Sequence, residues 1–552
     1  MEACVTTDLI LGPMLRFVDD RSATIWVETS GPCEVKVLES SSRTFSVAGH
    51  HYALVILSDL EPGTTVEYEV VIDGATVWPK PGSGMPPSVI RTQHPDQDVS
   101  LLLGSCRAAA PHEPPYTLEL TFNADGRGVD TLWAHAKRMA TKDPSEWPDL
   151  LVLLGDQIYA DDSSPQAKER IDARRSGSSA LPAETVADFE EYCWLYRETW
   201  SQPAERWLLS VVPSVMIFDD HDMIDDWNIS ASWVADIRQE SWWSEHAIGG
   251  LVSYWVYQHL GNLSPAEIEA EGILSSAQES EDATVMLRDW ATRSEALTPL
   301  AGGYRFSFVR RVGDVTVVVI DCRNGRVLTD DTRRMVGGEE WRWVTEQAAG
   351  SSGHVVLATS VPVFIPDGLH DLHVWNERLC GGALGRRAAR LGEQVRRYLD
   401  LEDWPAFMTS YTEFVALVEA LRSAPDPPKS ITVASGDIHF AFAAKVLAST
   451  TNGPSVWQVV SSPIRNALIP PERSVMRFTL TKAGRVIGAL LRRSVRGPDT
   501  RPGLELRTGP FFANNMTGLH FSADGVVLTV DQSTPDDDGQ SELFEVARLQ
   551  LN

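Results

Sequence analysis

Seven unbroken apolar runs between residues 99 and 463 constrain the fold of this chain more than any other feature. They read VSLLLGSC, DLLVLLGDQIY, VVPSVMIFDD, VTVVVIDCRN, HVVLATSVPVF, ITVASGDIHF and SVWQVVSSP. Runs of this kind are typical of strands that are buried on both faces. Helical patterns, such as those of residues 129–140 and 339–350, lie between several of them. The alternation predicts an α/β fold in which helices cover the outside of the sheets.

The segment before these runs has a different pattern. Residues 8–92 contain short stretches rich in Val, Ile, Tyr and Thr, separated in places by turn sequences such as Glu61-Pro62-Gly63. Short, regular strands predict a small β-sandwich, and LEPGTTVEYEVVIDG resembles part of a fibronectin type III domain. We therefore assign residues 1–95 to an N-terminal β-sandwich, which ends in the Pro/Gly-rich stretch 79–88.

The rest of the chain divides at about residue 470. Residues 96–470 contain the apolar runs and form the predicted α/β domain. Strand-like pieces return after this point, in the sequences VMRFTLTK, GRVIGALLRR, GVVLTVDQ and ELFEVARLQL. We expect residues 471–552 to form a β extension that packs on the α/β domain.

The charge balance narrows the choice of partners. The chain has 76 acidic and 48 basic residues, which gives a net charge of −28. This argues against nucleic acid or an anionic membrane as the main partner, because both are polyanions. No apolar run reaches the roughly 18 residues of a membrane span. The N-terminal stretch has no twin arginine and no basic region before a long apolar one, so we expect a cytoplasmic location.

Four of the apolar runs end in side chains that bind metals or transfer protons. These are Cys106 in the first run, Asp156 and Tyr159 in the second, Asp219, Asp220 and His221 in the third, and Asp437 and His439 in the sixth. In open α/β sheets, ligands bind beyond the carboxyl ends of the strands. We therefore predict that these side chains share one site.

Each of these residues also has a simpler explanation when it is taken alone. A cysteine after a strand is usually a small buried apolar residue, and aspartates in the stretch 219–226 fit helix N-caps. Tyr159 and His439 fit the core of a large domain. Four separate strand ends with such side chains nevertheless favour a shared site over four coincidences.

The order of the motifs resembles a known family. The chain carries G-S-C at 104–106, G-D-x-x-Y at 155–159, D-D-H-D at 219–222 and S-G-D-x-H at 435–439. This combination is similar to the PhoD-like alkaline phosphatases of the metallophosphoesterase superfamily. The resemblance implies a four-layer α/β/β/α sandwich and a metal-dependent phosphoesterase. Such an enzyme hydrolyses phosphate mono- or diesters by in-line attack of a metal-bound hydroxide.

The resemblance also implies two metal sites that share Asp156 as a bridging ligand. The first resembles the Fe(III) site of the family and would be completed by Cys106, Tyr159 and His439. Thiolate and phenolate are anionic donors that suit trivalent iron better than calcium. The two ions would together neutralise charge on the phosphoryl oxygens.

The second site implied by the resemblance would hold Ca(II) between Asp220 and Asp437. Calcium takes oxygen ligands, and other divalent metals also fit carboxylates. His221 would be the acid that protonates the leaving alcohol, because an imidazole titrates near neutral pH.

Three aspartates and one arginine lie next to these motifs. Family members often carry a tryptophan before D-D-H and an Asn-Asn pair after it, where this chain has Phe218 and Asp225-Asp226. We expect Asp219, Asp225 and Asp226 to support the metal ligands or to meet the substrate. Arg107 and the pair Arg323-Asn324 either meet a phosphate or pair with nearby aspartates.

Two other functions fit the same residues. One is a phosphodiesterase, including a phospholipase D-like hydrolase, that uses the same metals. The other is a non-catalytic calcium-binding scaffold, although a thiolate and a tyrosine beside the carboxylates argue against calcium alone.

Two further segments are predicted to be loops. Residues 163–186 have the composition of a mobile surface loop and are placed where a lid could overhang the site. The sequence HDLHVW, residues 370–375, is predicted to be an exposed loop rather than part of the substrate cleft.

Overall fold

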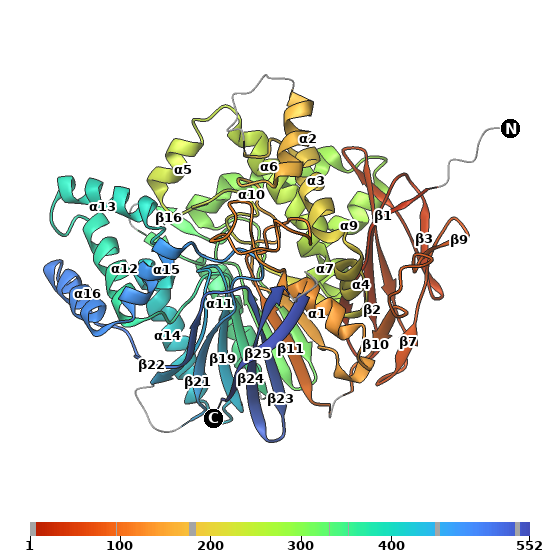
Figure 1. The fold of residues 1–552 in the computed structure, drawn as a ribbon. Coiled ribbons are helices and arrows are strands. Elements are labelled where there is room, and N and C mark those ends of the chain that lie inside the picture. The colour runs from red at the N-terminus through yellow and green to blue at the C-terminus, as the bar shows by residue number, and fades with distance from the viewer. Residues whose placement is uncertain are drawn as a thin grey trace.

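The protein comprises a small β-sandwich, a large α/β domain and a lobe of helices at the side opposite the sandwich (Figure 1). The computed structural model describes residues 7–94, 97–175, 184–329, 332–351, 353–447, 453–535 and 541–551. Among these residues, no helix combines the length and the apolarity that crossing a membrane requires.

The N-terminal β-sandwich consists of two four-stranded sheets and a short additional pair of strands. The first sheet has the order β1 (Leu9–Val18), β2 (Ala23–Thr29), β6 (His50–Leu57) and β5 (Phe45–Val47). The second has the order β4 (Ser40–Arg43), β3 (Glu34–Val37), β8 (Val70–Ile72) and β9 (Ala75–Trp78). The additional pair is β10 (Val89–Arg91) with β7 (Thr65–Glu67). The small sandwich is therefore confirmed, while its likeness to fibronectin type III stays a prediction.

Buried polar contacts attach the sandwich to the α/β domain. Arg16 of β1 is fully buried and donates hydrogen bonds to the carbonyl oxygens of Tyr257 and Gln258, at 3.0 and 2.7 Å. On β6, His50 places Nε2 2.7 Å from a carboxylate oxygen of Glu190, which belongs to the helix α3 (Phe189–Trp200). The sandwich thus packs against specific groups of the larger domain.

The α/β domain is built on two sheets that face each other. The first has the order β13 (Ser214–Met216), β12 (Leu150–Leu153), β11 (Val99–Gly104), β23 (Asn515–Ser522), β24 (Gly525–Pro535) and β25 (Ser541–Gln550). The second has the order β14 (Phe308–Val312), β15 (Val315–Ile320), β18 (His354–Thr359), β19 (Ser430–Ser435), β21 (Val456–Val460), β20 (Ala441–Leu447) and β22 (Gly503–Phe511). The seven predicted apolar runs form the parallel strands β13, β12 and β11 of one sheet and β15, β18, β19 and β21 of the other.

The side chains of these strands are buried on alternating faces. On β11, Leu101 and Leu103 belong to the core between the two sheets, whereas Leu102 belongs to the core beneath the helices. On β15, Val317 lies between the sheets and Val318 lies on the helix side. Because both faces are covered, the strands read as unbroken apolar runs, and the predicted α/β/β/α layering is confirmed.

Helices cover the outer faces and fill the connections. Those before β14 are α1 (Thr131–Met139), η1 (Pro144–Glu146), α2 (Pro165–Arg175), α3, α4 (Pro203–Val211), α5 (Ala231–Ile237), α6 (Trp243–Tyr254), the π-helix η2 (Trp255–His259), α7 (Leu260–Asn262), α8 (Pro265–Glu271), α9 (Ile273–Glu279) and α10 (Thr284–Ala301). Helix α1 packs on β23, β24 and β25. A small hairpin, β16 (Val327–Thr329) with β17 (Thr332–Arg334), follows β15.

The later helices are α11 (Gly338–Ala349), α12 (Asp367–Cys380), α13 (Arg386–Tyr398), η3 (Trp404–Ala406), α14 (Met408–Arg422), α15 (Pro470–Thr479) and α16 (Lys482–Ser494). Helix α11 packs on β15, and α13 and α16 pack against α12. The helices α12, α13, α15 and α16 form the side lobe, at the left of Figure 1.

The C-terminal segment differs from its prediction in one respect. The sequences VMRFTLTK and GRVIGALLRR, predicted as strands, lie in the helices α15 and α16. The Thr481 side chain accepts a hydrogen bond from the Gly484 amide and caps α16, a signal that the strand prediction overlooked. The later strands are confirmed and are integral to the first sheet, where β23 pairs with β11. The domain boundaries at residues 95 and 470 stay predictions.

Candidate metal centre

The motif loops at the ends of β11, β12 and β19 contact one another directly. The Cys106 amide donates to the Gly155 carbonyl oxygen at 3.3 Å, and the Arg107 amide donates to the Asp156 carbonyl oxygen at 3.1 Å. A Cβ atom on Gly436 would lie 2.3 Å from the Ser105 hydroxyl oxygen. The glycine before Asp437 is therefore needed because the loops approach each other too closely for a side chain.

Four of the predicted ligands have a backbone conformation that is rare for residues other than glycine. The φ angles are 57° at Cys106, 50° at Asp156, 68° at Asp437 and 54° at His439. Such a left-handed conformation costs about 1–2 kcal/mol per residue. Strain of this kind is concentrated at functional sites, where the surrounding structure enforces it. The loops thus hold these side chains in place at a cost in stability.

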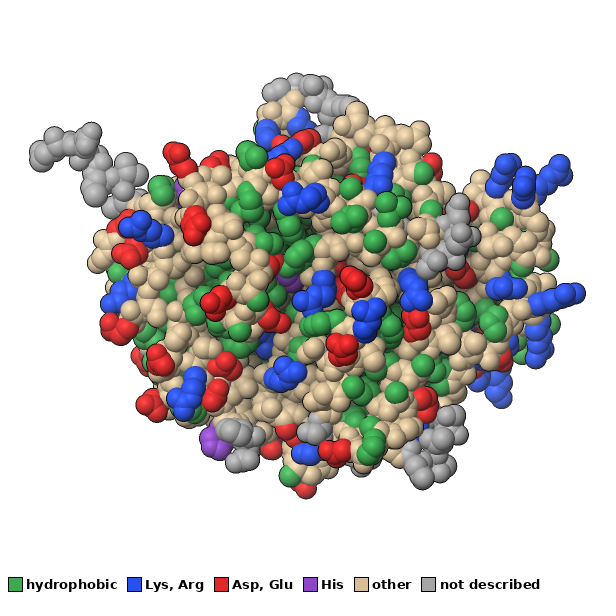
Figure 2. All heavy atoms as spheres, turned by 180° about the vertical axis from the view of Figure 1, so that it is seen from behind, with side chains coloured by type: hydrophobic (Ala, Val, Ile, Leu, Met, Phe, Trp, Pro, Cys, Tyr) green, Lys and Arg blue, Asp and Glu red, His purple; other side chains and the backbone are tan. Residues whose placement is uncertain are grey.

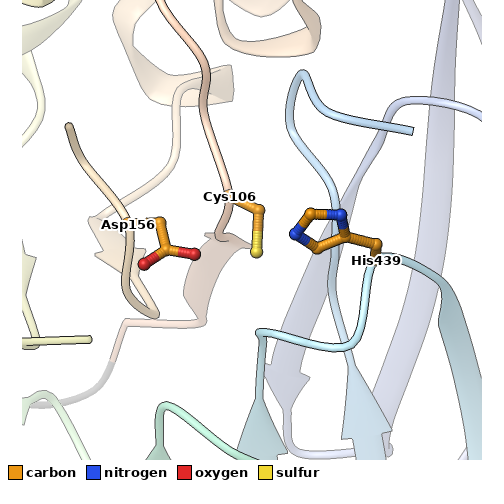
Figure 3. Close-up of side chains that lie close together, drawn as sticks. All are labelled: Cys106, Asp156 and His439. Atoms are coloured by element: carbon orange, nitrogen blue, oxygen red, sulfur yellow. The ribbon is translucent and has the colours of Figure 1, made fainter. Parts of the chain in front are cut away.

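Cys106, Asp156 and His439 form the first ligand cluster. Their Sγ, carboxylate oxygen and ring nitrogen atoms lie within 4.8 Å of one another, and all three side chains converge on one space (Figure 3). Tyr159 follows Asp156 by three residues, and its pKa is raised first by burial and then by the charges of Cys106 and Asp156. The predicted first site is therefore assembled from three separate strand ends.

A second cluster shares Asp156 with the first. It contains one carboxylate oxygen each from Asp156, Asp219, Asp220 and Asp437, all within 4.8 Å of one another. The fully buried Arg323 lies against this group, with Nε 2.5 Å from Asp219 and one terminal nitrogen 3.0 Å from Asp220 and 3.6 Å from Asp437. The other terminal nitrogen pairs with Glu402 at 2.5 Å. Arg323 thus follows the predicted alternative of a charge pair with aspartates.

The electrostatics of the site favour a bound cation. Burial, followed by the charge of Asp219, raises the pKa of Asp156 well above its usual range, and the same two causes raise the pKa of Asp437. Burial and the charges of Asp156 and Asp437 also raise the pKa of the Cys106 thiol. A nearby cation reverses these shifts because it stabilises the thiolate and the carboxylates.

Unpaired buried oxygens provide an independent test of this fit. Among the described residues, neither carboxylate oxygen of Asp156 receives a hydrogen bond, and the buried Tyr159 hydroxyl has no partner. Buried polar atoms without partners are rare in folded proteins, and metal coordination is one explanation. The donor set therefore fits metal ions at both clusters, with Asp156 between them.

His221 lies at the edge of the site. Its Nδ1 atom is 2.9 Å from a carboxylate oxygen of Asp161, and its ring stands 4.5 Å from the ring of Tyr159, measured between centroids. Burial lowers the pKa of His221, but the carboxylates of Asp161, Asp220 and Asp156 outweigh it and raise the pKa well above the usual value. A protonated imidazole beside the ligand cluster can act as a general acid.

The sequence interpretation missed Asp161. This residue follows Tyr159 by two positions and fixes the ring of His221. It also accepts a hydrogen bond from the Asp225 amide at 2.5 Å, which links the two loops. The available signal was an aspartate two residues after the G-D-x-x-Y motif.

The remaining aspartates of the stretch 219–226 have distinct positions. One oxygen of Asp222 accepts hydrogen bonds from the amides of Gln157 and Ile158, and the other accepts from the Asp219 amide. Asp222 therefore ties the second and third motif loops together. The Asp226 amide donates to Asp220 at 3.1 Å. The Asp225 side chain is 60% exposed and lies 3.9 Å from His221 Nε2, so it faces the opening of the site.

Arg107 does not face the ligand clusters. Its guanidinium is buried and pairs with Asp130 and Glu205, both at 2.8 Å. It also donates to the carbonyl oxygen of Thr199. Of the two alternatives for Arg107, the structure therefore fits the charge pair, because its donors are taken up by these groups.

The two predicted loops have different outcomes. HDLHVW lies in helix α12, and His370, Asp371 and His373 are buried, so the exposed-loop prediction is wrong. The predicted lid contains helix α2 at its start, and residues 176–183 lie outside the described residues.

Comparison with known proteins agrees with this geometry. The sequence profile of PhoD-like phosphatases matches residues 128–488, which is more than half of the chain. The chain belongs to the PhoD-like phosphatase family. This confirms the resemblance that rested on four short motifs. Cys106 precedes the matched range, so its place in the site rests on the geometry alone.

The solved structure of PhoD shares the fold of this chain. The alignment with the structure of PhoD covers 100% of this chain and 92% of the PhoD chain, with a TM-score of 0.57 and 11% identity. A purple acid phosphatase, PPD1 from yellow lupin (Lupinus luteus) seeds, covers 97% of this chain and 74% of its own length, with a TM-score of 0.45 and 10% identity. Residues 6–90 match a domain of unknown function, DUF7800. No curated protein sequence matches the chain.

Proposed function

We propose that this PhoD-like protein hydrolyses phosphate esters at a two-metal centre. The observation that carries the proposal is the convergence of five distant ligand residues. These are Cys106, Asp156, Asp220, Asp437 and His439. All of these residues except Asp220 have strained backbone conformations. Such strain is expected where geometry serves binding or catalysis rather than stability.

The donor types support Fe(III) at the first cluster and Ca(II) at the second. Cys106, Tyr159 and His439 would hold the iron with Asp156, and Asp220 and Asp437 would hold the calcium. When bound, two such ions lower the pKa of a coordinated water and neutralise charge on the phosphoryl oxygens. Arg323 already neutralises part of the charge on Asp220 and Asp437. The second cluster is therefore expected to bind its ion more weakly than the first.

His221 is the proposed general acid. Because Nδ1 is engaged with Asp161, Nε2 is the nitrogen that can donate a proton to the leaving oxygen. The carboxylate of Asp161, which belongs to neither ligand cluster, can keep that proton on the ring when ions occupy the site. Asp161 would orient the ring and stabilise its positive charge.

A phosphodiesterase that uses the same centre, including one of phospholipase D type, is the second candidate. Monoesters and diesters differ in charge, and the acidic Asp225 at the opening favours the less charged diester. Comparing p-nitrophenyl phosphate with bis(p-nitrophenyl) phosphate separates the two. A kcat/KM higher for the diester supports the second candidate.

The deciding experiment is the metal content and colour of the purified protein together with its turnover. Tyrosinate bound to Fe(III) gives a visible charge-transfer band that calcium, zinc and magnesium cannot give. We expect iron, the band and hydrolysis in the natural protein, and loss of the band in Tyr159→Phe. A colourless, iron-free but active enzyme would refute the iron assignment. Bound metal without turnover would instead favour the non-catalytic scaffold.

A further inference from the structure

The side lobe ends in two helices whose exposed surface is apolar. Val486, Ile487 and Leu490 of α16 are 60%, 47% and 58% exposed. Helix α15 contains no buried residue, and its Val475 and Phe478 are 59% and 45% exposed. Apolar side chains exposed in a group mark an interaction site more often than single ones do. We call this surface of α15 and α16 the lobe face.

The packing of α16 prevents the apolar side chains from turning inward. Its inner side carries Gly484 and Gly488, which lie against Gly368 of α12. A Cβ atom on Gly488 would stand 2.9 Å from the Gly368 carbonyl oxygen. Arg492, also on the inner side, pairs with the buried Asp371 at 2.7 Å. The helix is thus fixed with its small residues inside and its large apolar residues outside.

The lobe face is strongly basic although the whole chain is acidic. Residues 466–496 contain seven basic residues, of which only the inner Arg492 is buried, and one acidic residue, whereas the chain has a net charge of −28. Arg477, Arg485 and Arg493 are exposed. Within the described part of the chain, Arg485 and Arg493 form no ion pair. In Figure 2, where the lobe lies at the right edge, basic side chains project from it with green side chains between them.

Helix α13 adds to this charge. It lies on α12, in the same lobe, and carries five arginines and one glutamate between residues 386 and 398. Arg386, Arg387 and Arg390 are exposed, and Leu391 beside them is 59% exposed. The combination of exposed arginines and exposed aliphatic side chains is thus a property of the lobe rather than of one helix.

We propose that the lobe face docks on an anionic phospholipid bilayer. Helices with aliphatic side chains and arginines on an exposed face lie in the plane of the interface, with the apolar groups inserted at the headgroup level. The arginines contact lipid phosphates, and anionic lipids strengthen the binding electrostatically. No part of this requires a membrane span, and it does not depend on the hydrolase chemistry proposed above.

Two other occupants fit the lobe face less well. Nucleic acid would engage the arginines but would leave Val486, Ile487 and Leu490 without a partner. A second copy would bring an acidic surface to the basic lobe, but such a contact joins two different surfaces and forms open chains unless its rotation closes. A bilayer satisfies the charged and the apolar groups together.

Vesicle flotation of the full chain tests the proposal. We would compare phosphatidylcholine vesicles with vesicles that contain about 30% phosphatidylglycerol, at low and high salt. We expect the protein to float only with the anionic vesicles, and high salt to weaken the binding, because exposed charges are screened. The disrupting variant is Val486→Ser/Ile487→Ser/Leu490→Ser, which should bind at least about tenfold more weakly.

The matched control is Val285→Ser/Leu297→Ser/Leu300→Ser on α10, where the side chains are 71%, 50% and 63% exposed. This variant removes a similar apolar area and should float like the natural protein. Circular dichroism and the thermal midpoint show that both variants fold. The proposal is overturned if the natural protein does not float with anionic vesicles at low salt, or if both variants float equally. Self-association in sedimentation velocity that only the α16 variant abolishes, without vesicle binding, would assign the face to a second copy instead.

Discussion

At the scale of single residues, the site combines groups that would repel one another without a cation. Asp219, Asp220 and Asp437 are brought together by two loops, and Arg323 is the one fixed positive charge that contacts all of them in the described structure. A buried charge that loses its partner costs far more than an exposed one. Arg323 therefore stabilises the loops whether or not metals are bound.

Replacing Arg323 should make the stability of the protein depend on divalent cations. We expect Arg323→Met to lower the free energy of unfolding by about 3–5 kcal/mol in EDTA, because the buried carboxylates lose their counter-charge. Added calcium should recover part of this loss. Arg326→Met is the control, because Arg326 pairs with Glu402 and, in the described structure, with none of the three aspartates. Thermal unfolding of both variants with EDTA and with calcium measures the effect, and an equal calcium response of the two would contradict it.

The proposed role of His221 gives a second prediction, which concerns leaving groups. We expect His221→Gln to lower kcat by about 10²–10⁴-fold for alkyl phosphate esters, whose alkoxide must be protonated as it leaves. The loss should be much smaller for p-nitrophenyl esters, because p-nitrophenolate is stable without a proton. Steady-state rates with a methyl and a p-nitrophenyl ester test this. Equal losses on both substrates would point to a structural role for His221.

At the scale of elements, the strands and the site were predictable and the lobe was not. Leu101, Leu102 and Leu103 are buried on alternating faces, so the apolar run itself indicated a strand covered on both sides. The ligands follow such strands directly, and the ends of parallel strands meet at one edge. Helix α16 lacks this signal, because its glycines are inside and Val486 and Ile487 are outside. The local sequence was read as a strand because β-branched residues are common in strands.

The environment of Arg107 could not be predicted for a different reason. The partner of Arg107 is Glu205, about a hundred positions later in the chain, and the pairing depends on where α4 packs. Sequence spacing along one loop carries no information about such contacts. The motif loops, by contrast, are connected through backbone hydrogen bonds between their own residues.

The close contact between α12 and α16 gives a prediction at this scale. Gly488→Ala should destabilise the lobe by about 1–3 kcal/mol, because its Cβ atom would lie 2.9 Å from the Gly368 carbonyl oxygen. Helix propensity alone predicts the opposite, a gain of up to about 1 kcal/mol. Limited proteolysis in the lobe and the thermal midpoint report the outcome. Ala483→Ser on the exposed side of α16 is the control and should change little.

At the scale of the whole molecule, the net charge gave no information about where the charges lie on the surface. A chain with a net charge of −28 argued against an anionic membrane, yet residues 466–496 are strongly basic. Electrostatic attraction at a surface acts within about 10 Å at ordinary salt, so the local charge decides which partner can approach. The average over the chain describes solubility rather than recognition.

The attachment of the β-sandwich to the α/β domain gives the last prediction. His50 contacts Glu28 at 3.2 Å and Glu190 of α3 at 2.7 Å, and a terminal nitrogen of Arg197 lies 2.8 Å from its Nδ1. Burial lowers the pKa of His50, but Cys193, Glu28 and Glu190 outweigh it and raise the pKa to about 11. The unfolded value is about 6.5, so the protonated histidine stabilises the folded state fully below that pH. This contribution is lost as the pH rises toward 11.

The natural protein should therefore be more stable than His50→Gln at about pH 6.5, and this difference in stability should decrease as the pH rises to about 10. We expect the difference in free energy of unfolding to shrink by about 1–3 kcal/mol over this range, since solvent screens part of the interaction. Urea unfolding of both proteins at several pH values measures it, and the comparison cancels the titration of lysines and tyrosines elsewhere. His51→Gln serves as the control, because burial lowers the pKa of His51 and the sign of its effect is reversed. If the difference between the natural protein and His50→Gln stays constant with pH, His50 is neutral at the junction. The sandwich would then be held by its other contacts, which include Arg16 and the Arg197–Glu28 ion pair.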